Sequence, residues 1–255
     1  MQADQRGSES SSPLFDEHKN MSWKHSVKMM VARLGYHLER NSENPEHTWI
    51  GLKTLPIRTI IDVGANEGQF AQRSLRQFPG AHIVCFEPLP GPSAVLSRWA
   101  QGQPRVTVYT CALGEQDAEA EMFVHSDHTP SSSFLKSTAL SSQLYPFTSR
   151  QAKMIVPVKR LDDVLAEGAP LQTDILVKMD VQGFEGRVIR GGTNVLRRAK
   201  ACIVEISLDT LYDGQSTFKE IFSELDALSF RYAGNLSQAY SADAHVVYLD
   251  AVFLR

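Results

Sequence analysis

The fold is decided by the stretch Ile60-Ile61-Asp62-Val63-Gly64-Ala65-Asn66-Glu67-Gly68-Gln69-Phe70. An apolar run enters a turn with the pattern Gly-x-Asn-x-Gly, and a helical pattern follows the turn. Small residues in such a turn let a ligand come close to the backbone, and glycine relieves the turn itself. Open α/β proteins bind their ligands at the carboxyl edge of the sheet. The stretch therefore predicts a strand, a ligand-binding turn and a helix.

Strand and helix patterns alternate on the C-terminal side of this turn. Apolar runs predict strands at residues 57–63, 81–86, 106–112, 175–179 and 201–206. Helical spacing predicts helices at residues 69–78, 93–101, 184–196 and 217–228. This alternation indicates a parallel sheet with helices on both faces. The near-continuous apolar character of the runs agrees with strands that are covered on both sides.

The last two strands are predicted at residues 230–233 and 245–254. The loop between them is polar and leaves no room for a helix, so they should pair antiparallel. Two additional strands are predicted at residues 120–125 and 154–161, and Pro157 makes the second an expected edge strand because proline cannot donate a hydrogen bond. Together the patterns predict a Rossmann-like α/β fold. Its sheet is mostly parallel and seven-stranded, with an antiparallel C-terminal strand and additional N-terminal helices.

Two segments fall outside this alternating core. Residues 1–20 are polar and Ser-rich, and we expect a disordered tail there. Residues 21–56 form an expected helical cap on the main domain, 57–255, and serve either as plain packing or as a lid. Within the cap, helices are predicted at residues 21–40 and 45–55. The Ser- and Thr-rich segment 126–150 is long enough to be either functional or disordered.

Composition and charge are those of an ordinary globular protein. Hydrophobic residues make up 42% of the chain and charged residues 22%, with a net charge of -3. The basic residues form no stripe, which argues against nucleic acid as a partner. Cys85, Cys111 and Cys202 each lie in an apolar run without a CxxC pair, which indicates buried free thiols in a reducing compartment. We find no signal-peptide core and no transmembrane segment, so we expect a cytoplasmic protein.

The turn itself selects among nucleotide-like ligands. It has neither the G-x-G-x-x-G pattern of dinucleotide sites nor the phosphate-loop pattern. Asp62 stands just before the turn, where a carboxylate repels phosphate and suits an ammonium or a sulfonium. Glu87 ends the next strand about 20 residues later and can accept hydrogen bonds from both ribose hydroxyls. These two acids together favour S-adenosylmethionine. At the end of the third strand, Ala112-Leu113 either packs against the adenine ring or simply leads from the strand into the next turn.

Several motifs in this order resemble the FkbM family of methyltransferases. They are Asp62-Val63-Gly64-Ala65-Asn66-Glu67-Gly68, Phe86-Glu87-Pro88, Ala112-Leu113-Gly114, Ser131-Ser132-Ser133, Lys178-Met179-Asp180-Val181-Gln182-Gly183-Phe184-Glu185 and Val204-Glu205-Ile206. The resemblance implies a class I methyltransferase fold, S-adenosylmethionine, and O-methylation of sugars or natural products such as polyketides. It also implies that Asp62, Gly64, Asn66 and Gly68 form the first cofactor loop and that Glu87 binds ribose. Ala65 and Pro88 lie inside these motifs and are candidate cofactor residues too.

Methyl transfer to a hydroxyl needs alignment of acceptor and methyl, and a base for the proton. Asp180 follows the fourth core strand and is the candidate base, with substrate binding, cofactor binding or a structural role as the alternatives. Lys178 lies two residues earlier on the same face of the strand, as a catalytic residue or an ion-pair partner. His125 and His128 border the Ser-rich segment and are alternative bases. Glu185 is expected to cap the following helix.

A catalytic divalent metal is an open alternative. Asp180 and Glu205 lie at the ends of neighbouring predicted strands, in places that suit magnesium. Asp209 is the candidate for a third ligand. A candidate stacking face for a sugar ring is offered by Tyr145, Phe147 and Tyr212.

The sequence thus predicts an S-adenosylmethionine-dependent O-methyltransferase. Its acceptor would be a hydroxyl of a sugar, glycoside or polyketide-like metabolite, that is, a small-molecule or glycan substrate. Three alternatives remain open: an N- or C-methyltransferase, a non-catalytic domain that binds the cofactor or a partner, and a nicotinamide oxidoreductase. The motifs leave the oligomeric state open.

Overall fold

The structure is a computed structural model that describes residues 17–36, 38, 40–41, 43–166 and 171–255. The chain divides into two compact units, Met1–Asn44 and Pro45–Arg255. In the first unit, helix α1 (Glu17–Arg33) begins inside the segment that was predicted to be a tail. It ends before the predicted residue 40 because Gly35, with a φ of 82°, takes the left-handed conformation that terminates helices. Residues 1–16 of the predicted tail lie outside the described residues.

The second unit begins with two short helical turns instead of the single helix predicted at 45–55. These are α2 (Pro45–Thr48) and η1 (Trp49–Thr54). Trp49 is buried, and its ring lies 6.0 Å from that of Phe70. In the structure this segment therefore belongs to the core of the second unit, and its role as a lid stays a prediction.

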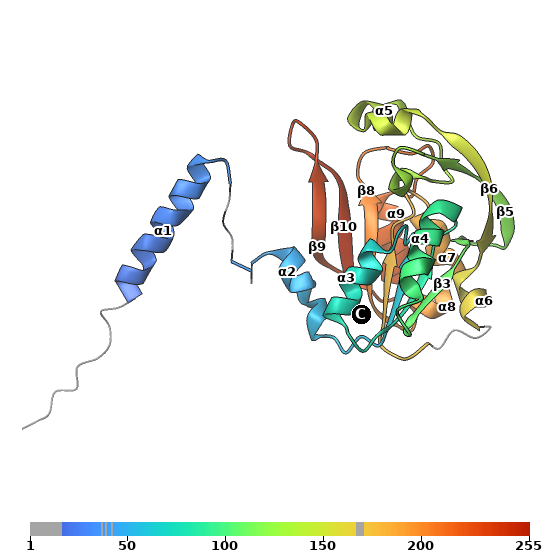
Figure 1. The fold of residues 1–255 in the computed structure, drawn as a ribbon, viewed down its shortest axis with the longest axis horizontal. Helices are drawn as coiled ribbons and strands as arrows, with labels where there is room; N and C mark the ends of the chain where they lie inside the picture. Colours follow the sequence, from blue (N-terminus) through green and yellow to red (C-terminus); the bar gives the residue numbers. More distant parts are fainter. Residues whose placement is uncertain (1–16, 37, 39, 42, 167–170) are drawn as a thin grey trace, which may run out of the picture. The chain divides into compact units, whose positions relative to one another are not determined.

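A seven-stranded sheet forms the centre of the second unit (Figure 1). Its mutually parallel strands are β1 (Thr59–Val63), β2 (His82–Phe86), β3 (Val106–Tyr109), β7 (Ile175–Met179) and β8 (Ala199–Ser207). The last strands, β9 (Arg231–Tyr240) and β10 (Val246–Leu254), pair antiparallel with each other, and β10 pairs antiparallel with β8. The order β3-β2-β1-β7-β8-β10-β9 confirms the predicted sheet.

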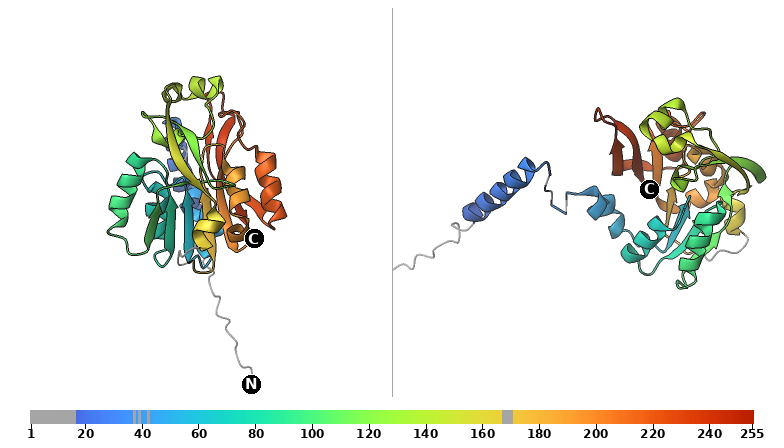
Figure 2. Two further views of the ribbon diagram at one scale, coloured as in Figure 1. Left: turned by 90° about the vertical axis from the view of Figure 1, so that its right-hand side faces the viewer. Right: turned by 45° about the horizontal axis from the view of Figure 1, so that its top comes forward.

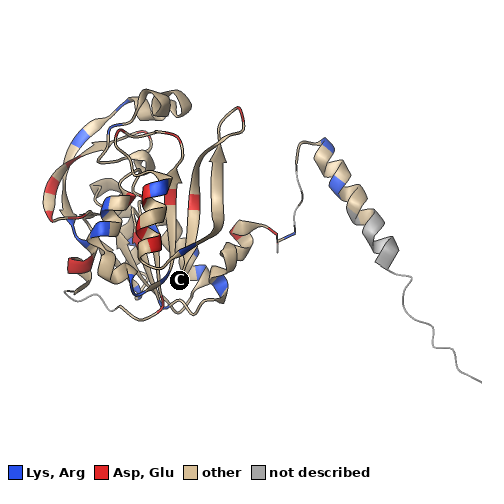
Figure 3. Ribbon diagram, turned by 180° about the vertical axis from the view of Figure 1, so that it is seen from behind, with Lys and Arg blue, Asp and Glu red and all other residues tan. Residues whose placement is uncertain are grey.

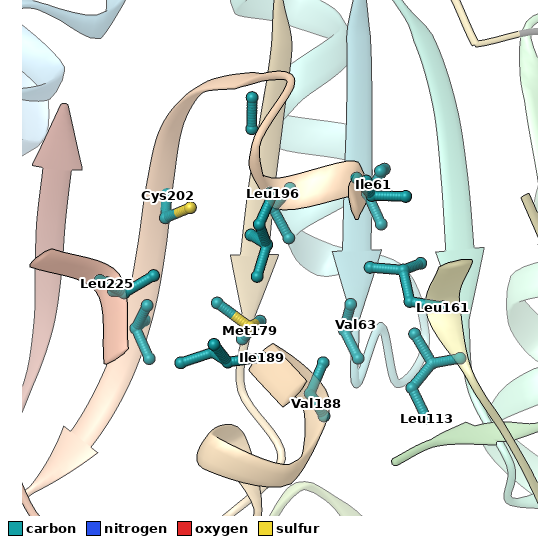
Figure 4. Close-up of a cluster of buried hydrophobic side chains, with 14 of the residues drawn as sticks. Ile61, Val63, Leu113, Leu161, Met179, Val188, Ile189, Leu196, Cys202 and Leu225 are labelled. Carbon is teal, nitrogen blue, oxygen red and sulfur yellow. The ribbon is translucent and has the colours of Figure 1, made fainter. Parts of the chain in front are cut away.

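Helices cover both faces of this sheet (Figure 2). One face packs against η1, α3 (Gln69–Gln77) and α4 (Pro90–Ala100). The other packs against α6 (Leu161–Ala166), α7 (Glu185–Gly191), α8 (Thr193–Leu196) and α9 (Phe218–Ala227). Figure 4 shows the second of these cores, in which Met179 of β7 meets Ile189 of α7. The helix predicted at 184–196 is divided at Gly192, whose φ of -121° is not helical.

A small second sheet lies beside the main one. It contains β4 (Ala112–Leu113), β5 (Ala118–Val124) and β6 (Ala152–Lys159) in the order β4-β6-β5. The strand predicted at 106–112 was therefore too long: β3 ends at Tyr109 because its partner β2 ends at Phe86. The edge position predicted for the strand with Pro157 was also wrong. β4 pairs with β6 only at Val158 and Lys159, so the missing N–H of Pro157 breaks no hydrogen bond on that side.

The Ser- and Thr-rich segment 126–150 is folded over the carboxyl edge of the main sheet (Figure 1). It contains η2 (Thr129–Ser131), α5 (Ala139–Leu144) and η3 (Pro146–Ser149). Two isolated bridges anchor the segment, one between Phe123 and Ser133 and one between Ser137 and Tyr212. The anchoring residues hold part of this segment beside the ends of the strands.

The remaining predictions from composition have different outcomes. The three cysteines are buried and free, as predicted. Acidic and basic residues alternate along the ribbon in Figure 3. The lack of a nucleic-acid partner stays a prediction. None of the helices in the described ranges has the length and apolar character needed to cross a membrane.

Candidate functional site

A cavity of about 350 Å³ lies at the carboxyl ends of β1, β2 and β7. Because β1 stands between β2 and β7, the strand order reverses here, and open α/β sheets bind ligands at such a reversal. The walls come from the turn after β1, the ends of β2 and β7, helix α3, the small sheet and the segment 129–134. The cavity thus lies at the edge where the sequence predicted a ligand.

The turn after β1 forms one wall through Gly64, Ala65 and Asn66. Gly64 has a φ of 77°, and a Cβ there would lie 1.9 Å from the carbonyl oxygen of Asp180. Glycine is therefore required because two loops meet at this point. Gly68 does not line the cavity: it begins α3 with a φ of 91°, and a Cβ there would lie 2.7 Å from Leu96. Its function in the structure is to start the helix and let it pack.

Glu87 at the end of β2 lines the cavity while being 4% exposed. Its Oε2 accepts a hydrogen bond from the backbone N–H of Asn66 at 2.8 Å, and its Oε1 accepts one from Leu89 at 2.9 Å. Burial raises the pKa of this carboxyl to about 7, although the two backbone donors lower it. A carboxylate fixed in this way has further lone pairs available for the ribose hydroxyls.

Asp62 has a different position from the one the sequence argument gave it. It lies within β1, is fully buried beneath α3 and does not line the cavity. Burial raises its pKa to about 6, and the nearby ammonium of Lys178 lowers it. The cation nearest to Asp62 in the structure is the ammonium of Lys178, whose Nζ lies 3.8 Å from its Oδ1, and direct contact of Asp62 with the cofactor stays a prediction.

Lys178 is enclosed between two carboxylates. Its Nζ lies 3.0 Å from Oδ2 of Asp180 and 3.8 Å from Oδ1 of Asp62. Burial alone would lower the pKa of Lys178, but the two carboxylates raise it above its usual range. The ion-pair role considered from the sequence agrees with this geometry, and Lys178 also lines the cavity.

The opposite wall of the cavity is apolar. It comprises Pro88, Leu89, Ala112, Leu113, Met122 and Phe134. Ala112 and Leu113 leave the main sheet as β4, so their side chains are held by the small sheet and not by β3. This surface suits a flat aromatic base, and Ala112, Leu113 and Pro88 are all among the residues predicted to contact the cofactor.

The loop after β7 contains a contact that sequence reasoning missed. Nε2 of Gln182 donates to Oδ1 of Asp180 at 2.8 Å and to Oε1 of Glu205 at 2.6 Å. Its Oε1 accepts a hydrogen bond from the hydroxyl of Tyr212 at 2.6 Å. Gln182 has a φ of 55°, which is uncommon for a non-glycine residue, and the buried Glu185 stabilises the loop by accepting the N–H of Val181 at 3.0 Å. The motif from Lys178 to Glu185 marks this loop in the sequence, but it carries no sign that Gln182 reaches Glu205 of the neighbouring strand.

The carboxylates of Asp180 and Glu205 are the candidate magnesium ligands. Asp180 and Glu205 do converge, but the amide of Gln182 lies between their carboxylates. Among the described residues there is no group of three or more His, Cys, Asp or Glu side chains arranged to hold a metal ion. Asp209 instead pairs with His245, at 2.8 Å.

A second, smaller cavity of about 150 Å³ adjoins the first at Asp180 and Pro130, which line both. Its aromatic walls include all three residues of the predicted stacking face. The other members of its lining are His128, Ser131, Ser141, Thr148, Gln182, Glu205, Leu211 and Tyr248. The second cavity therefore joins an aromatic surface to two carboxylates.

His125, one of the two candidate histidine bases, is not brought to either cavity. It is 1% exposed, and its Nδ1 lies 3.2 Å from the carbonyl oxygen of Arg150 while its Nε2 lies 3.2 Å from Oγ of Ser137. Burial lowers its pKa. The geometry thus gives His125 a structural position, in which it links the two ends of the Ser-rich segment.

The groups along the first cavity follow the order of the strands. An apolar wall lies on the β4 side, Glu87 ends β2, and the charged residues Lys178 and Asp180 end β7. S-adenosylmethionine carries a base, a ribose and a charged amino-acid part in the same order, so the residues present fit it. Fold and cavity together define a class I S-adenosylmethionine-dependent methyltransferase.

Comparison with known proteins agrees with this class. The Methyltransferase FkbM domain matches residues 62–232. The chain belongs to the FkbM family of methyltransferases, and S-adenosylmethionine is its methyl donor.

Relatives share part of their length with this chain. It is 28% identical to the 2-O-methyltransferase NoeI of Sinorhizobium fredii over 69% of this chain and 74% of that protein. It is 30% identical to the 31-O-demethyl-FK506 methyltransferase FkbM of Streptomyces tacrolimicus over 55% of this chain. The chain spans 62% of that relative and 57% of Methyltransferase 1 of Beauveria bassiana. 

Solved methyltransferase structures resemble this chain only distantly. Magnesium protoporphyrin IX methyltransferase (ChlM) of Synechocystis PCC 6803 has a TM-score of 0.43 and 11% identity over 97% of this chain and 86% of that one. The plantazolicin methyltransferase BpumL has a TM-score of 0.43 and 10% identity over 94% of this chain and 91% of that one.

Proposed function

We propose that this methyltransferase transfers the methyl group to a hydroxyl oxygen of a small molecule such as a sugar, a glycoside or a polyketide-like metabolite. Two relatives support oxygen as the acceptor atom, since one is a 2-O-methyltransferase and the other acts on 31-O-demethyl-FK506. The observation that carries the proposal is that Asp180 lines both cavities, with a carboxylate on their common wall.

Asp180 is the residue proposed to act on the acceptor hydroxyl. When bound, S-adenosylmethionine supplies a methyl carbon made electrophilic by the sulfonium. The carboxylate of Asp180 accepts the hydrogen of the hydroxyl, which orients the oxygen and takes up its proton as the oxygen is methylated. Lys178 binds one oxygen of this carboxylate and Gln182 binds the other, so its direction is fixed before the acceptor arrives.

The second cavity supports a neutral acceptor. Tyr145, Phe147 and Tyr212 provide apolar ring faces, and Asp180 and Glu205 provide hydrogen-bond acceptors. A carboxylate or phosphate on the acceptor would be repelled by the carboxylate of Asp180. Burial and the neighbouring Asp180 raise the pKa of Glu205 well above its usual range, which favours its uncharged form. Hydroxyl groups on a ring would bind to the acids while the ring packs on the aromatic side chains.

Methyl transfer from radiolabelled S-adenosylmethionine to a panel of methyl glycosides, oligosaccharides and macrolide alcohols tests the proposal, with matching amines as the comparison. For an accepted alcohol, Asp180→Asn should lower turnover by about 100-fold, the size typical of a lost general base. Its affinity for S-adenosylhomocysteine should stay within about twofold of wild type. Asp226→Asn, an exposed change on α9, is the control. Transfer to amines alone, or full turnover by Asp180→Asn, would refute the proposal.

A further inference from the structure

Arg73 of α3 has no role in the proposed reaction, yet it lines the first cavity. Gln69, Phe70 and Arg73 are spaced so that all three lie on one face of the helix, and all three line the cavity. Arg73 is half-buried, whereas Arg76 on the same helix is exposed. The helix therefore directs one arginine of the pair to the wall of the cofactor cavity.

Two contacts hold the guanidinium of Arg73 in place. It lies over the ring of Trp49, 5.2 Å from the ring centroid, and it donates a hydrogen bond to the carbonyl oxygen of Glu46 at 3.3 Å. Trp49 is itself fixed by burial and by stacking on Phe70. A guanidinium has five N–H donors in a planar fork, and these contacts use its face and one nitrogen. Donors consequently remain for a ligand.

The positive charge of Arg73 is available in a way that the charge of Lys178 is not. Among the cavity-lining residues in the described part of the chain, these two carry cationic side chains. Lys178 is held between Asp62 and Asp180. Arg73 forms no ion pair with a carboxylate of the described residues, and Asp250 on β10 is near enough to sense its charge but not to pair with it.

The position of Arg73 matches one end of the methyl donor. Adenine suits the apolar wall beside β4, and the ribose suits Glu87, so the amino-acid part is left for the remaining end of the cavity, which Arg73, Lys178 and Asp180 line. That part ends in a carboxylate, which needs a cation or several N–H donors when it is taken out of water. Arginine binds carboxylates through two parallel hydrogen bonds.

From these observations we infer that Arg73 binds the carboxylate of the donor's amino-acid part. Arg73 then selects the complete donor over nucleosides that lack this carboxylate. The inference concerns the donor cavity and goes beyond the proposed acceptor chemistry, so its test needs no acceptor.

The test compares two ligands that differ in one group, S-adenosylmethionine and decarboxylated S-adenosylmethionine, by calorimetry. Arg73→Gln keeps a side chain that covers Trp49 but removes the charge. We expect it to weaken binding of S-adenosylmethionine by about tenfold or more, the usual size for a lost hydrogen bond to a charged group. Its affinity for the decarboxylated ligand should stay within about twofold of wild type. Arg76→Gln is the matched control and should change neither affinity.

Two results of this binding experiment would overturn the inference. Equal weakening for both ligands would overturn the inference, because it would show that Arg73 acts by supporting Trp49 and the cavity wall. Unchanged binding of S-adenosylmethionine by Arg73→Gln would overturn it too. Arg73→Lys provides a second check: it restores the charge without the fork, and its discrimination between the two ligands should fall between those of wild type and Arg73→Gln. Wild-type protein that binds neither ligand would overturn the donor site itself, whereas a failed acceptor assay would leave the Arg73 result intact.

Discussion

The Nζ of Lys178 lies 3.0 Å from Oδ2 of Asp180, on the wall that the two cavities share. The same ammonium lies 3.8 Å from Oδ1 of Asp62, which is fully buried. One cation thus compensates a carboxylate of the core and orients a carboxylate of the site. Under the proposed function, this residue therefore couples stability to catalysis.

Lys178→Met should destabilise the protein strongly. It leaves Asp62 buried without its cation, and breaking a buried ion pair in this way costs about 3–5 kcal/mol. Burial already raises the pKa of Asp62 to about 6, so the loss should be greater at pH 8 than at pH 5, where Asp62 can be protonated. Urea unfolding at the two pH values measures both effects.

The control for Lys178 is an exposed pair. Lys153 and Glu121 lie 2.7 Å apart, with side chains 59% and 46% exposed. Lys153→Met should therefore cost less than about 1 kcal/mol at either pH. A Lys178→Met variant no less stable than Lys153→Met would contradict the coupling described above.

Glu87 should make donor binding depend on pH. Its pKa in the free protein is raised to about 7 by burial. Both oxygens already accept a backbone N–H, so only the ionised carboxylate, with no proton on either oxygen, keeps a lone pair free for each ribose hydroxyl. A ligand that prefers the ionised form binds more tightly as pH rises through this pKa. Affinity for S-adenosylhomocysteine should increase between about pH 5.5 and pH 8 and level off above the pKa. Calorimetry on Glu87→Gln should show weaker binding without this pH dependence.

Gly64→Ala should abolish donor binding and lower stability. The new Cβ would lie 1.9 Å from the carbonyl oxygen of Asp180, and the φ of 77° adds about 1 kcal/mol or more of strain. The turn and the loop after β7 must move apart, which deforms the cavity. Gly80→Ala, in the turn before β2, meets no atom within 4 Å and should be neutral or slightly stabilising. Thermal melting and S-adenosylhomocysteine binding distinguish the two, and a stable Gly64→Ala variant with full affinity would count against the described contact.

The fold was largely predictable because its signals are local. The apolar runs of β1, β2, β7 and β8 and the helical spacing between them define a parallel sheet from the sequence alone. The errors lie where a partner decides the outcome. Whether residues 110–113 continue β3 depends on where β2 ends, and whether Pro157 is tolerated depends on how little of β6 is paired with β4.

The site was predictable in position but less so in its details. Motif and strand count brought Glu87, Ala112 and Asp180 to one cavity. Asp62 was given a ligand contact because a carboxylate just before the turn suits a cationic group, yet it lies within β1 and is fully buried. The contacts of Gln182 with Glu205 and Tyr212 could not be predicted, because these partners are distant in the sequence. The same holds for the contacts of Arg73 with Glu46 and Trp49.

His125→Gln should spare turnover while lowering stability. Both ring nitrogens of His125 have partners in the Ser-rich segment, and neither cavity includes the residue. We expect turnover within about threefold of wild type and a loss of about 1–2 kcal/mol in the free energy of unfolding. Since burial lowers the pKa of His125, its contribution to wild-type stability is lost as pH falls below the usual histidine range. A loss of turnover by 100-fold in a folded variant would restore His125 as a candidate base.

Gln182→Asn should separate catalysis from donor binding. Asparagine keeps the amide and tolerates the φ of 55°, but it is one methylene too short to reach both Asp180 and Glu205. Without the bridging amide the two carboxylates repel each other, and Asp180 turns away from the direction in which it meets the acceptor. Turnover should therefore fall by about tenfold or more, while affinity for S-adenosylhomocysteine stays within about twofold because Gln182 does not line the donor cavity. A variant that loses both properties equally would instead show that Gln182 supports the whole loop after β7.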